Sequence, residues 1–397
     1  MSAAPTRPPR SLVEAAIEDS STAYRAFAGR GPVVWDPGSE SWYVHDPDLI
    51  KALARGTVLR ARGVPAGVSQ LTAADRGVIE PVERFFARWL AFSDPPRQQR
   101  LRRLIAPALA PARVEAHLRR LPSRARQLVR DLPPERCDLL DRVVVPLSRH
   151  TTAALIGGPP GALAELEVIS AGLIAYLATP GMDRAAAEVA ADAIDRLVAV
   201  LDRVVDYRSP VSTVLRELIA DGHGDTLDAA ALVAQLLTGA LEPLTTALAV
   251  CLLAAGDEHR RGGRLATGPE LGPWIERQLA AQPPFHFAPR VAATDIRLGG
   301  VVVAAGQRVV LNLLAANMAM SDPAVRRRDH DAGRHLSFGN GVHACLGSAI
   351  ARTHLRLCLP DLADPELLGR LDPDRVVRRA VFGMTSFGRI PLSGRPW

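Results

Sequence analysis

Most of the chain has the hydrophobic spacing of amphipathic helices, in which apolar residues recur every three to four positions. Between residues 112 and 230 this spacing is interrupted where proline and glycine cluster, and the longest uninterrupted pattern follows at residues 228–255. Further helical patterns cover residues 47–55 and 97–109, and we expect Asp94 to cap the second of these helices. The pattern predicts a mainly α-helical protein.

A smaller part of the chain alternates apolar and polar residues, as β-strands do. Residues 32–35 and 41–44 form one such pair, residues 295–303 form a hairpin around Gly299-Gly300, and residues 309–313 add another strand. These segments predict a small β-sheet region. Residues 56–80 fit neither period, and we expect them to be irregular.

The domain organisation follows from prolines and from the absence of long linkers. Pro5, Pro8 and Pro9 make residues 1–12 a flexible N-terminal arm. No internal repeat or long polar linker divides the remainder, so we expect residues 13–397 to form a single domain.

Composition and charge narrow the function classes. The chain of 397 residues is 48% hydrophobic and has a net charge of +6, and Lys51 is its only lysine. The arginines are dispersed among acidic residues with no basic stripe, which makes nucleic acid an improbable partner. No stretch of eighteen apolar residues and no apolar N-terminal run is present, so we expect a cytoplasmic protein without a membrane segment.

A glycine-rich loop near the C-terminal end holds the strongest candidate chemistry. Residues 338–347 read Phe-Gly-Asn-Gly-Val-His-Ala-Cys-Leu-Gly, and a helical pattern follows at residues 348–359. Glycines let a backbone wrap closely around one sulfur, and amide groups and a helix N-terminus that face a thiolate lower its pKa. A lone cysteine is more often a buried apolar residue, but the spacing of the glycines favours a loop that holds a thiolate.

This loop resembles, at every fixed position, the haem-binding signature of the cytochrome P450 family, and the resemblance extends over residues 24–397. It implies the cytochrome P450 fold and a haem b cofactor (iron protoporphyrin IX) with Cys345 as the thiolate ligand of the iron. It also implies that His343 faces a haem propionate, that Phe338 packs beside the sulfur, and that Gly347 is a cofactor-binding residue of the same motif.

The resemblance implies further cofactor-binding residues. Relatives hold a propionate with a histidine and an arginine on the helix after Asp-Pro-Pro, where this chain has Gln98 and Arg102. Arg290 occupies the place of a second propionate ligand. For both arginines the alternative is an ordinary surface residue.

Residues near Arg290 and near the C-terminus are candidates for contact with substrate. By the same resemblance, Phe285, His286 and Phe287 line the pocket, and Met384 and Thr385 reach it from a closing hairpin. We expect His286 to be a pocket wall or a hydrogen-bonded residue, and give little weight to a role as an iron ligand.

The long helix departs from the family at its centre. Relatives have an acid and a threonine that relay protons during oxygen activation, whereas this chain has Gly239, Ala240, Glu242 and Pro243 in that segment. The next hydroxyls come two and three positions later and face other directions. We hypothesise that Pro243 keeps the helix groove open but removes the relay hydroxyl; the alternative is a simple kink without a redox role.

The family's Glu-x-x-Arg pair is also missing, because Arg277 and Ala280 stand at its positions. Loss of one member of a buried charge network would leave its partners unpaired at a cost of about 3–5 kcal/mol. Since all members are replaced together, we expect a rebuilt core around this helix.

These residues suggest a monooxygenase-type oxidoreductase that acts on a small apolar or carrier-bound intermediate of bacterial secondary metabolism, with non-standard oxygen activation. Its electron donor would be a ferredoxin and ferredoxin reductase or a similar acidic partner. A non-oxygenating haem enzyme (isomerase, dehydratase or cyclase) and a catalytically silent accessory protein are the alternatives.

Overall fold

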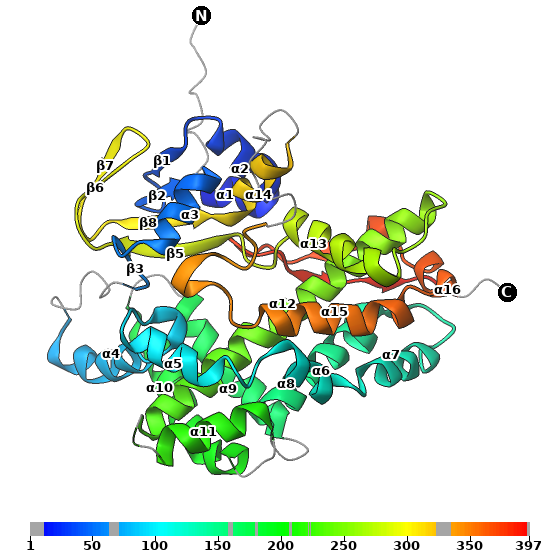
Figure 1. Ribbon diagram of the computed structural model, residues 1–397, viewed down its shortest axis with the longest axis horizontal. Helices are drawn as coiled ribbons and strands as arrows, with labels where there is room; N and C mark the ends of the chain where they lie inside the picture. Colours follow the sequence, from blue (N-terminus) through cyan, green and yellow to red (C-terminus); the bar gives the residue numbers. More distant parts are fainter. Residues whose placement is uncertain are drawn as a thin grey trace, which may run out of the picture. The chain divides into compact units, whose positions relative to one another are not determined.

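The computed structural model describes residues 12–62, 71–157, 162–178, 182–205, 209–220, 222, 224–322 and 335–394 (Figure 1). The chain divides into two compact units. Unit 1 comprises residues 1–60, 276–342 and 378–386, and unit 2 comprises residues 61–275, 343–377 and 387–397. The predicted fold class, mainly α with a small β-sheet region, is confirmed.

Unit 1 contains a five-stranded sheet and the helices beside it (Figure 1). Its elements are α1 (Leu12–Glu18), α2 (Ser20–Ala28), β1 (Val33–Asp36), β2 (Ser41–Val44), α3 (Pro47–Arg55), β3 (Leu59–Arg60), β5 (Phe287–Ala292), β6 (Ile296–Leu298), β7 (Val301–Val303), β8 (Arg308–Asn312) and α14 (Leu313–Ser321). The strand order is β1-β2-β8-β5-β3, in which β2 and β8 run parallel and the other neighbours antiparallel.

Both faces of this sheet are covered, because successive side chains of a strand point to opposite faces. Val309 and Leu311 of β8 pack with Ile50 of α3 in one hydrophobic cluster. Val310, between them in the sequence, packs with Tyr24 of α2 in the other. The predicted hairpin at Gly299-Gly300 joins β6 to β7, and both glycines have positive φ (52° and 90°).

Unit 2 is mainly helical. Its elements are α4 (Ala73–Phe86), α5 (Arg97–Ile105), α6 (Pro111–Leu118), α7 (Leu121–Arg130), β4 (Cys137–Asp138), α8 (Val145–Ile156), α9 (Ala162–Ala178), α10 (Arg184–Val205), α11 (Pro210–Ala220), α12 (Thr226–Arg260), α15 (Ser348–Leu362), α16 (Pro365–Gly369), β10 (Phe387–Arg389) and β11 (Pro391–Leu392). A unit boundary falls within α13 (Leu271–Ala281) and another within β9 (Val377–Arg378).

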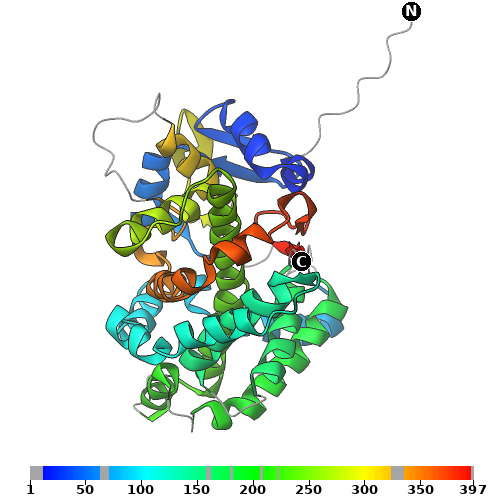
Figure 2. The same ribbon diagram turned by 90° about the vertical axis from the view of Figure 1, so that its right-hand side faces the viewer.

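Helix α12 is the central element of unit 2, with α8, α10 and α15 packed beside it (Figures 1 and 2). It begins at a capping box in which the Asp225 side chain accepts the Asp228 N–H and the Asp228 side chain accepts the Asp225 N–H. Among the described residues it is the one helix that could cross a membrane by length and composition, but 56% of its most apolar window is buried in the protein. Burial of that extent is what a core helix shows.

Three expectations about local structure need correction. Residues 73–80 of the stretch expected to be irregular belong to α4 (Ala73–Phe86), which Gly77 and Pro81 obscured in the sequence. Residues 63–70 of that stretch lie outside the described residues. Asp94 does not cap α5, because its Oδ1 accepts the backbone N–H of Ala61 (2.9 Å).

Helix α5 ends at Ile105, four residues earlier than expected. The predicted N-terminal arm lies outside the described residues except for its last residue, Leu12, which already begins α1.

Candidate active site

The glycines of the cysteine loop are needed where the loop approaches another element. Gly341 has φ of 68°, and a Cβ atom there would lie 1.9 Å from the carbonyl oxygen of Ala54, at the end of α3. Any larger residue would push the loop away from α3.

Residue Cys345 is exposed, although protein atoms crowd around its sulfur. The backbone N–H groups of Gly347 and Ser348 donate hydrogen bonds to the sulfur, in the arrangement that the sequence predicts. Burial nevertheless raises the pKa of the Cys345 thiol, and these two amides with Arg102 and Arg352 offset that effect only in part. The two amides thus lower the pKa of Cys345 as predicted, against the larger effect of burial.

Helix α5 places a cation beside this loop. The Nη1 atom of Arg102 donates to the carbonyl oxygen of Ala344 at 2.6 Å, one residue before Cys345. Gln98, one turn earlier on α5, is buried at 1% exposure. His343 Nε2 lies 3.8 Å from Asp94 Oδ1, just before α5.

The centre of α12 opens to solvent between two buried stretches. Residues 228–234 and 244–252 are buried, whereas Gly239 is exposed and Ala240, Glu242 and Pro243 are half-buried. A Cβ atom on Gly239 would meet no atom within 4 Å. The helix continues through Pro243.

The neighbouring threonines do not share this opening. Thr245 and Thr246 lie in the buried stretch, with exposures of 8% and 1%. As predicted, their hydroxyls cannot take the place of a hydroxyl at position 243.

These features of unit 2 fit a haem. An accessible thiol that receives two amide hydrogen bonds is a suitable ligand for iron. At the open centre of α12, the missing side chain of Gly239 leaves space in which a bound group could lie. The guanidinium of Arg102 supplies a positive charge for a carboxylate.

The other two predicted cofactor-binding residues belong to unit 1 and remain predictions. Arg290 lies on β5, where its Nη1 atom donates to the Pro289 carbonyl oxygen (2.7 Å). The ring of Phe338 lies 5.6 Å from the ring of His335.

The substrate-contact candidates separate into buried and accessible residues. His286 is buried, and its ring nitrogens lie 3.0 Å from Thr385 Oγ1 and 3.4 Å from Tyr24 Oη. Burial lowers the pKa of His286 to about 4, so the ring is neutral at pH 7. Thr385 is buried too, which argues against its contact with substrate.

The ring of Phe287 packs against aromatic rings of the unit 1 core, including those of Tyr24 and Tyr43. Phe285 is 41% exposed and pairs through an isolated β-bridge with Met384, which is half-buried. Phe285 and Met384 are therefore the accessible members of the set.

A rebuilt polar network occupies the region of the missing Glu-x-x-Arg pair. Asn317 on α14 donates to the Ala280 carbonyl oxygen (3.1 Å) and to Ser337 Oγ (2.8 Å), and its Oδ1 accepts the Leu336 N–H (2.7 Å). Ser337 Oγ donates in turn to the Leu279 carbonyl oxygen (2.8 Å). Asn317 therefore ties α13 to the residues that lead into the cysteine loop.

Glu276, at the unit 1 end of α13, lies close to this network. His335 Nδ1 accepts the Ser337 N–H (3.1 Å). The Nε2 atom of His335 lies 3.2 Å from Glu276 Oε2. Sequence reasoning missed Asn317, a single asparagine in an apolar segment, and His335, a single histidine after a charged segment, because neither position carries a motif.

Comparison with known proteins identifies relatives over most of the chain. No family model matches. Cytochrome P450-SU2 of Streptomyces griseolus is 28% identical over 353 residues, which cover 87% of this chain and 84% of that protein. The mycinamicin IV hydroxylase/epoxidase of Micromonospora griseorubida is 31% identical over 286 residues, 67% of this chain and 69% of that protein.

Solved structures show the same fold. P450BioI in complex with an acyl carrier protein ligated to hexadec-9Z-enoic acid superposes with a TM-score of 0.79, at 20% identity, over 96% of this chain and all of that chain (100%). CalO2 superposes with a TM-score of 0.78, at 20% identity, over 96% of this chain and 97% of that chain. The relatives cover most of the chain, and the Cys345 thiol accepts amide hydrogen bonds at the end of its glycine-rich loop. The chain therefore belongs to the cytochrome P450 family.

Proposed function

We propose that this protein carries out an oxidative step on a small apolar or carrier-bound intermediate of bacterial secondary metabolism. The observation that carries the proposal is the accessible Cys345 thiol, held by the amides of Gly347 and Ser348. Support for the substrate class comes from relatives named as a mycinamicin IV hydroxylase/epoxidase and a nocardicin C N-oxygenase. The structural neighbour P450BioI, in complex with an acyl carrier protein, supports a carrier-bound substrate.

The protein is a monooxygenase-type oxidoreductase, and haem b, when bound, supplies the activation of dioxygen. The amides of Gly347 and Ser348 hold the sulfur of Cys345 and moderate the charge that it donates. Arg102 would hold a propionate through its positive charge, and Gln98 on the same helix would donate a neutral hydrogen bond. The family resemblance assigns the same role to Arg290.

A spectrum of the reduced protein with carbon monoxide tests the haem ligand. We expect the red-shifted band of thiolate-bound haem in the wild type and its loss in Cys345→Ser, with an unchanged far-ultraviolet circular dichroism spectrum as the control. If the purified wild type holds no haem and shows no such band, the proposal is wrong and the accessory-protein alternative stands.

Oxygen activation is proposed to run without a threonine hydroxyl. Proline at position 243 cannot donate a backbone hydrogen bond and clashes with the carbonyl of Gly239, four residues earlier. Because Gly239 is exposed, its freed carbonyl oxygen can accept a hydrogen bond from water. The Glu242 side chain, half-buried on the same segment, then passes protons taken from bulk solvent to that water.

Exchange of Pro243 for threonine tests this role. Under the proposal, Pro243→Thr restores both the helix bond and a relay hydroxyl, and it changes the fraction of reductant electrons recovered as hydrogen peroxide. Leu241→Thr is the matched control, since it adds a hydroxyl to the same helix and leaves the proline in place. Equal fractions in the wild type and Pro243→Thr would mean that Pro243 is a simple kink.

The same proline favours a second candidate, a non-oxygenating haem enzyme such as an isomerase, dehydratase or cyclase. A protein of that kind does not need a proton relay at position 243. Substrate conversion under anaerobic conditions without reductant would identify it. The third candidate, an accessory protein, is less favoured because Asn317 and His335 still organise the residues before the cysteine loop.

Electrons are proposed to come from a ferredoxin with its reductase, in the cytoplasm. Arg100 and Arg103 are exposed on α5. They border a hollow of about 270 Å³ whose other lining residues are Leu101, Leu104 and Leu218. Two exposed cations beside an apolar surface suit an acidic protein partner.

A further inference from the structure

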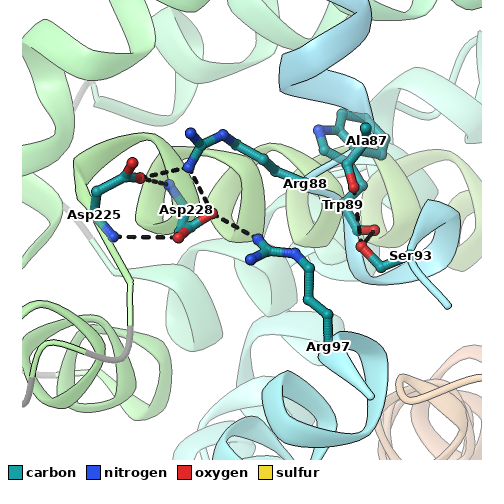
Figure 3. Close-up of polar contacts among 7 residues, drawn as sticks. All are labelled: Ala87, Arg88, Trp89, Ser93, Arg97, Asp225 and Asp228. Carbon is teal, nitrogen blue, oxygen red and sulfur yellow. Dashed lines mark hydrogen bonds and ion pairs between the residues drawn. The ribbon is translucent and has the colours of Figure 1, made fainter. Parts of the chain in front are cut away.

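An ion-pair network joins the start of α12 to α5 (Figure 3). Asp228 Oδ1 accepts from Arg97 Nη2 at 2.6 Å and from Arg88 Nη1 at 2.8 Å, and Arg88 Nη1 also lies 2.7 Å from Asp225 Oδ1. The Asp228 side chain is 8% exposed, whereas those of Arg88 and Arg97 are 30% and 32% exposed. Two arginines and two aspartates balance each other in charge.

Asp228 is held as a carboxylate in this network. Burial acts to raise the pKa of Asp228, but the hydrogen bonds from Arg97, from the backbone of residue 225 and from Arg88 outweigh it, and the pKa lies below its usual value. A nearly buried carboxylate needs these partners, because an unpaired charge at such a site costs several kcal/mol.

Helix α5 connects this network to the cysteine loop. Arg97 is the first residue of α5, and Arg102 lies five residues later, about 7.5 Å along the helix axis at the usual rise per residue. Arg97 contacts α12, and Arg102 contacts the Ala344 carbonyl beside Cys345. A helix of this length moves as a rigid body, so a contact that fixes its first turn also fixes the position of Arg102.

The two arginines on Asp228 differ in what they hold. Arg97 belongs to α5, whereas Arg88 belongs to the turn after α4. Arg88 makes the larger number of ion pairs, with Asp225 and Asp228. Removal of Arg88 therefore perturbs the start of α12 at least as much as removal of Arg97, but it leaves the link between α12 and α5 intact.

We propose that Arg97 is a positioning residue for the haem site, whose ion pair with Asp228 holds Arg102 at the cysteine loop. This inference rests on the proposed haem site. Arg97 does not touch the cofactor; it acts through α5.

The test compares Arg97→Gln with Arg88→Gln in the haem-loaded, full-length protein. The readouts are the rate of haem transfer to apomyoglobin and the share of the reduced carbon monoxide complex that keeps the red-shifted thiolate band. Thermal unfolding of both variants measures their general loss of stability. For Arg97→Gln we expect haem transfer to be faster by about fivefold or more and a smaller thiolate share, since a partly buried ion pair contributes on the order of 1 kcal/mol.

Arg88→Gln should leave both haem readouts close to the wild type even where it lowers the unfolding temperature more. Arg97→Lys keeps the positive charge and should show haem readouts close to those of the wild type. If Arg97→Gln does not fold, the haem readouts of Arg97→Lys are compared with those of Arg88→Gln instead. Equal haem readouts for the two glutamine variants would overturn the inference. Absence of the thiolate band from the wild type would instead overturn the proposed haem site.

Discussion

His45 shows how a single residue can oppose stability. Its ring is 4% exposed between the rings of Phe27 and Tyr43, and neither ring nitrogen has a hydrogen-bond partner among the described residues. Burial lowers the pKa of His45 to about 4, with no charged group contributing. The imidazole therefore stays neutral in the folded protein at pH values where it would be charged in the unfolded chain.

The consequence for pH dependence has a definite sign. The pKa is about 6.5 in the unfolded chain and about 4 in the folded protein, so below pH 6.5 the unfolded state binds more protons. His45 thus has no pH-dependent effect above about pH 7 and lowers stability progressively as the pH falls from 6.5 to 4. At pH 5 the loss is about 2 kcal/mol.

We predict that His45→Phe stabilises unit 1. The substitution removes two unsatisfied buried nitrogens, which is worth about 1–3 kcal/mol at pH 7.5, and the gain should grow by about 2 kcal/mol at pH 5. Denaturant unfolding at both pH values measures the effect, with exposed His117→Gln as the control. A gain that does not change with pH would mean that the ring nitrogens have a partner such as bound water.

At the scale of elements, a polar clasp joins α4 to α9. Glu83 on α4 accepts both hydrogen bonds from Arg62 Nη2 (2.9 and 2.8 Å) and a third from Tyr176 Oη on α9 (2.7 Å). The Tyr176 ring stacks on Phe86 with an interplanar angle of 6°. Burial, followed by the contact with Glu83, raises the pKa of Tyr176, so its hydroxyl remains a donor. From the resemblance to cytochrome P450s we expect α9 to be one of two lid helices over the active site.

Tyr176→Phe should loosen this lid helix while preserving its ring stacking. Loss of a buried hydrogen bond to a carboxylate costs about 1.5–3 kcal/mol. We therefore expect faster backbone hydrogen exchange in α9. We also expect faster dissociation of an azole inhibitor that binds the haem iron. Arg149→Gln is the control, because it breaks a largely exposed ion pair of the same helix, with Glu167. If the two variants exchange alike, the clasp does not control the lid.

The cysteine loop depends on Asn317 at the same scale. Its side chain is 1% exposed and makes three hydrogen bonds, to α13 and to residues 336 and 337. We predict that Asn317→Leu, similar in size but without polar atoms, lowers haem occupancy of the purified protein severalfold, because three buried partners lose their bonds. Ser321→Ala, which removes one bond on the same helix, should leave haem occupancy unchanged. Full occupancy in Asn317→Leu would show that Glu276 and His335 suffice.

At the scale of the whole molecule, the sequence predicted the elements well and the long-range polar contacts poorly. Helix α3, the β1–β2 hairpin and α12 follow from hydrophobic period and caps, which are local properties. Arg102 could be placed near Cys345 only through a family motif, since 242 positions separate it from its partner Ala344. The bonds of Arg97 with Asp228 and of Asn317 with Ser337 have no motif, and their residue types are ordinary for exposed positions.

The last prediction concerns the docking of an electron donor. If Arg100 and Arg103 form the face that an acidic ferredoxin contacts, the double variant Arg100→Glu/Arg103→Glu should slow reduction by a surrogate ferredoxin about tenfold or more at low ionic strength. The difference should shrink as salt is added, because these exposed charges are screened over about 10 Å at 0.1 M.

The control is the double variant Arg119→Glu/Arg120→Glu, which changes two exposed arginines after α6 and supplies the same charge change elsewhere on unit 2. Equal slowing by both double variants would indicate an effect of net charge, and the hollow beside Leu218 would not be the docking face. Reduction by dithionite, which needs no protein contact, should proceed at the wild-type rate in all variants.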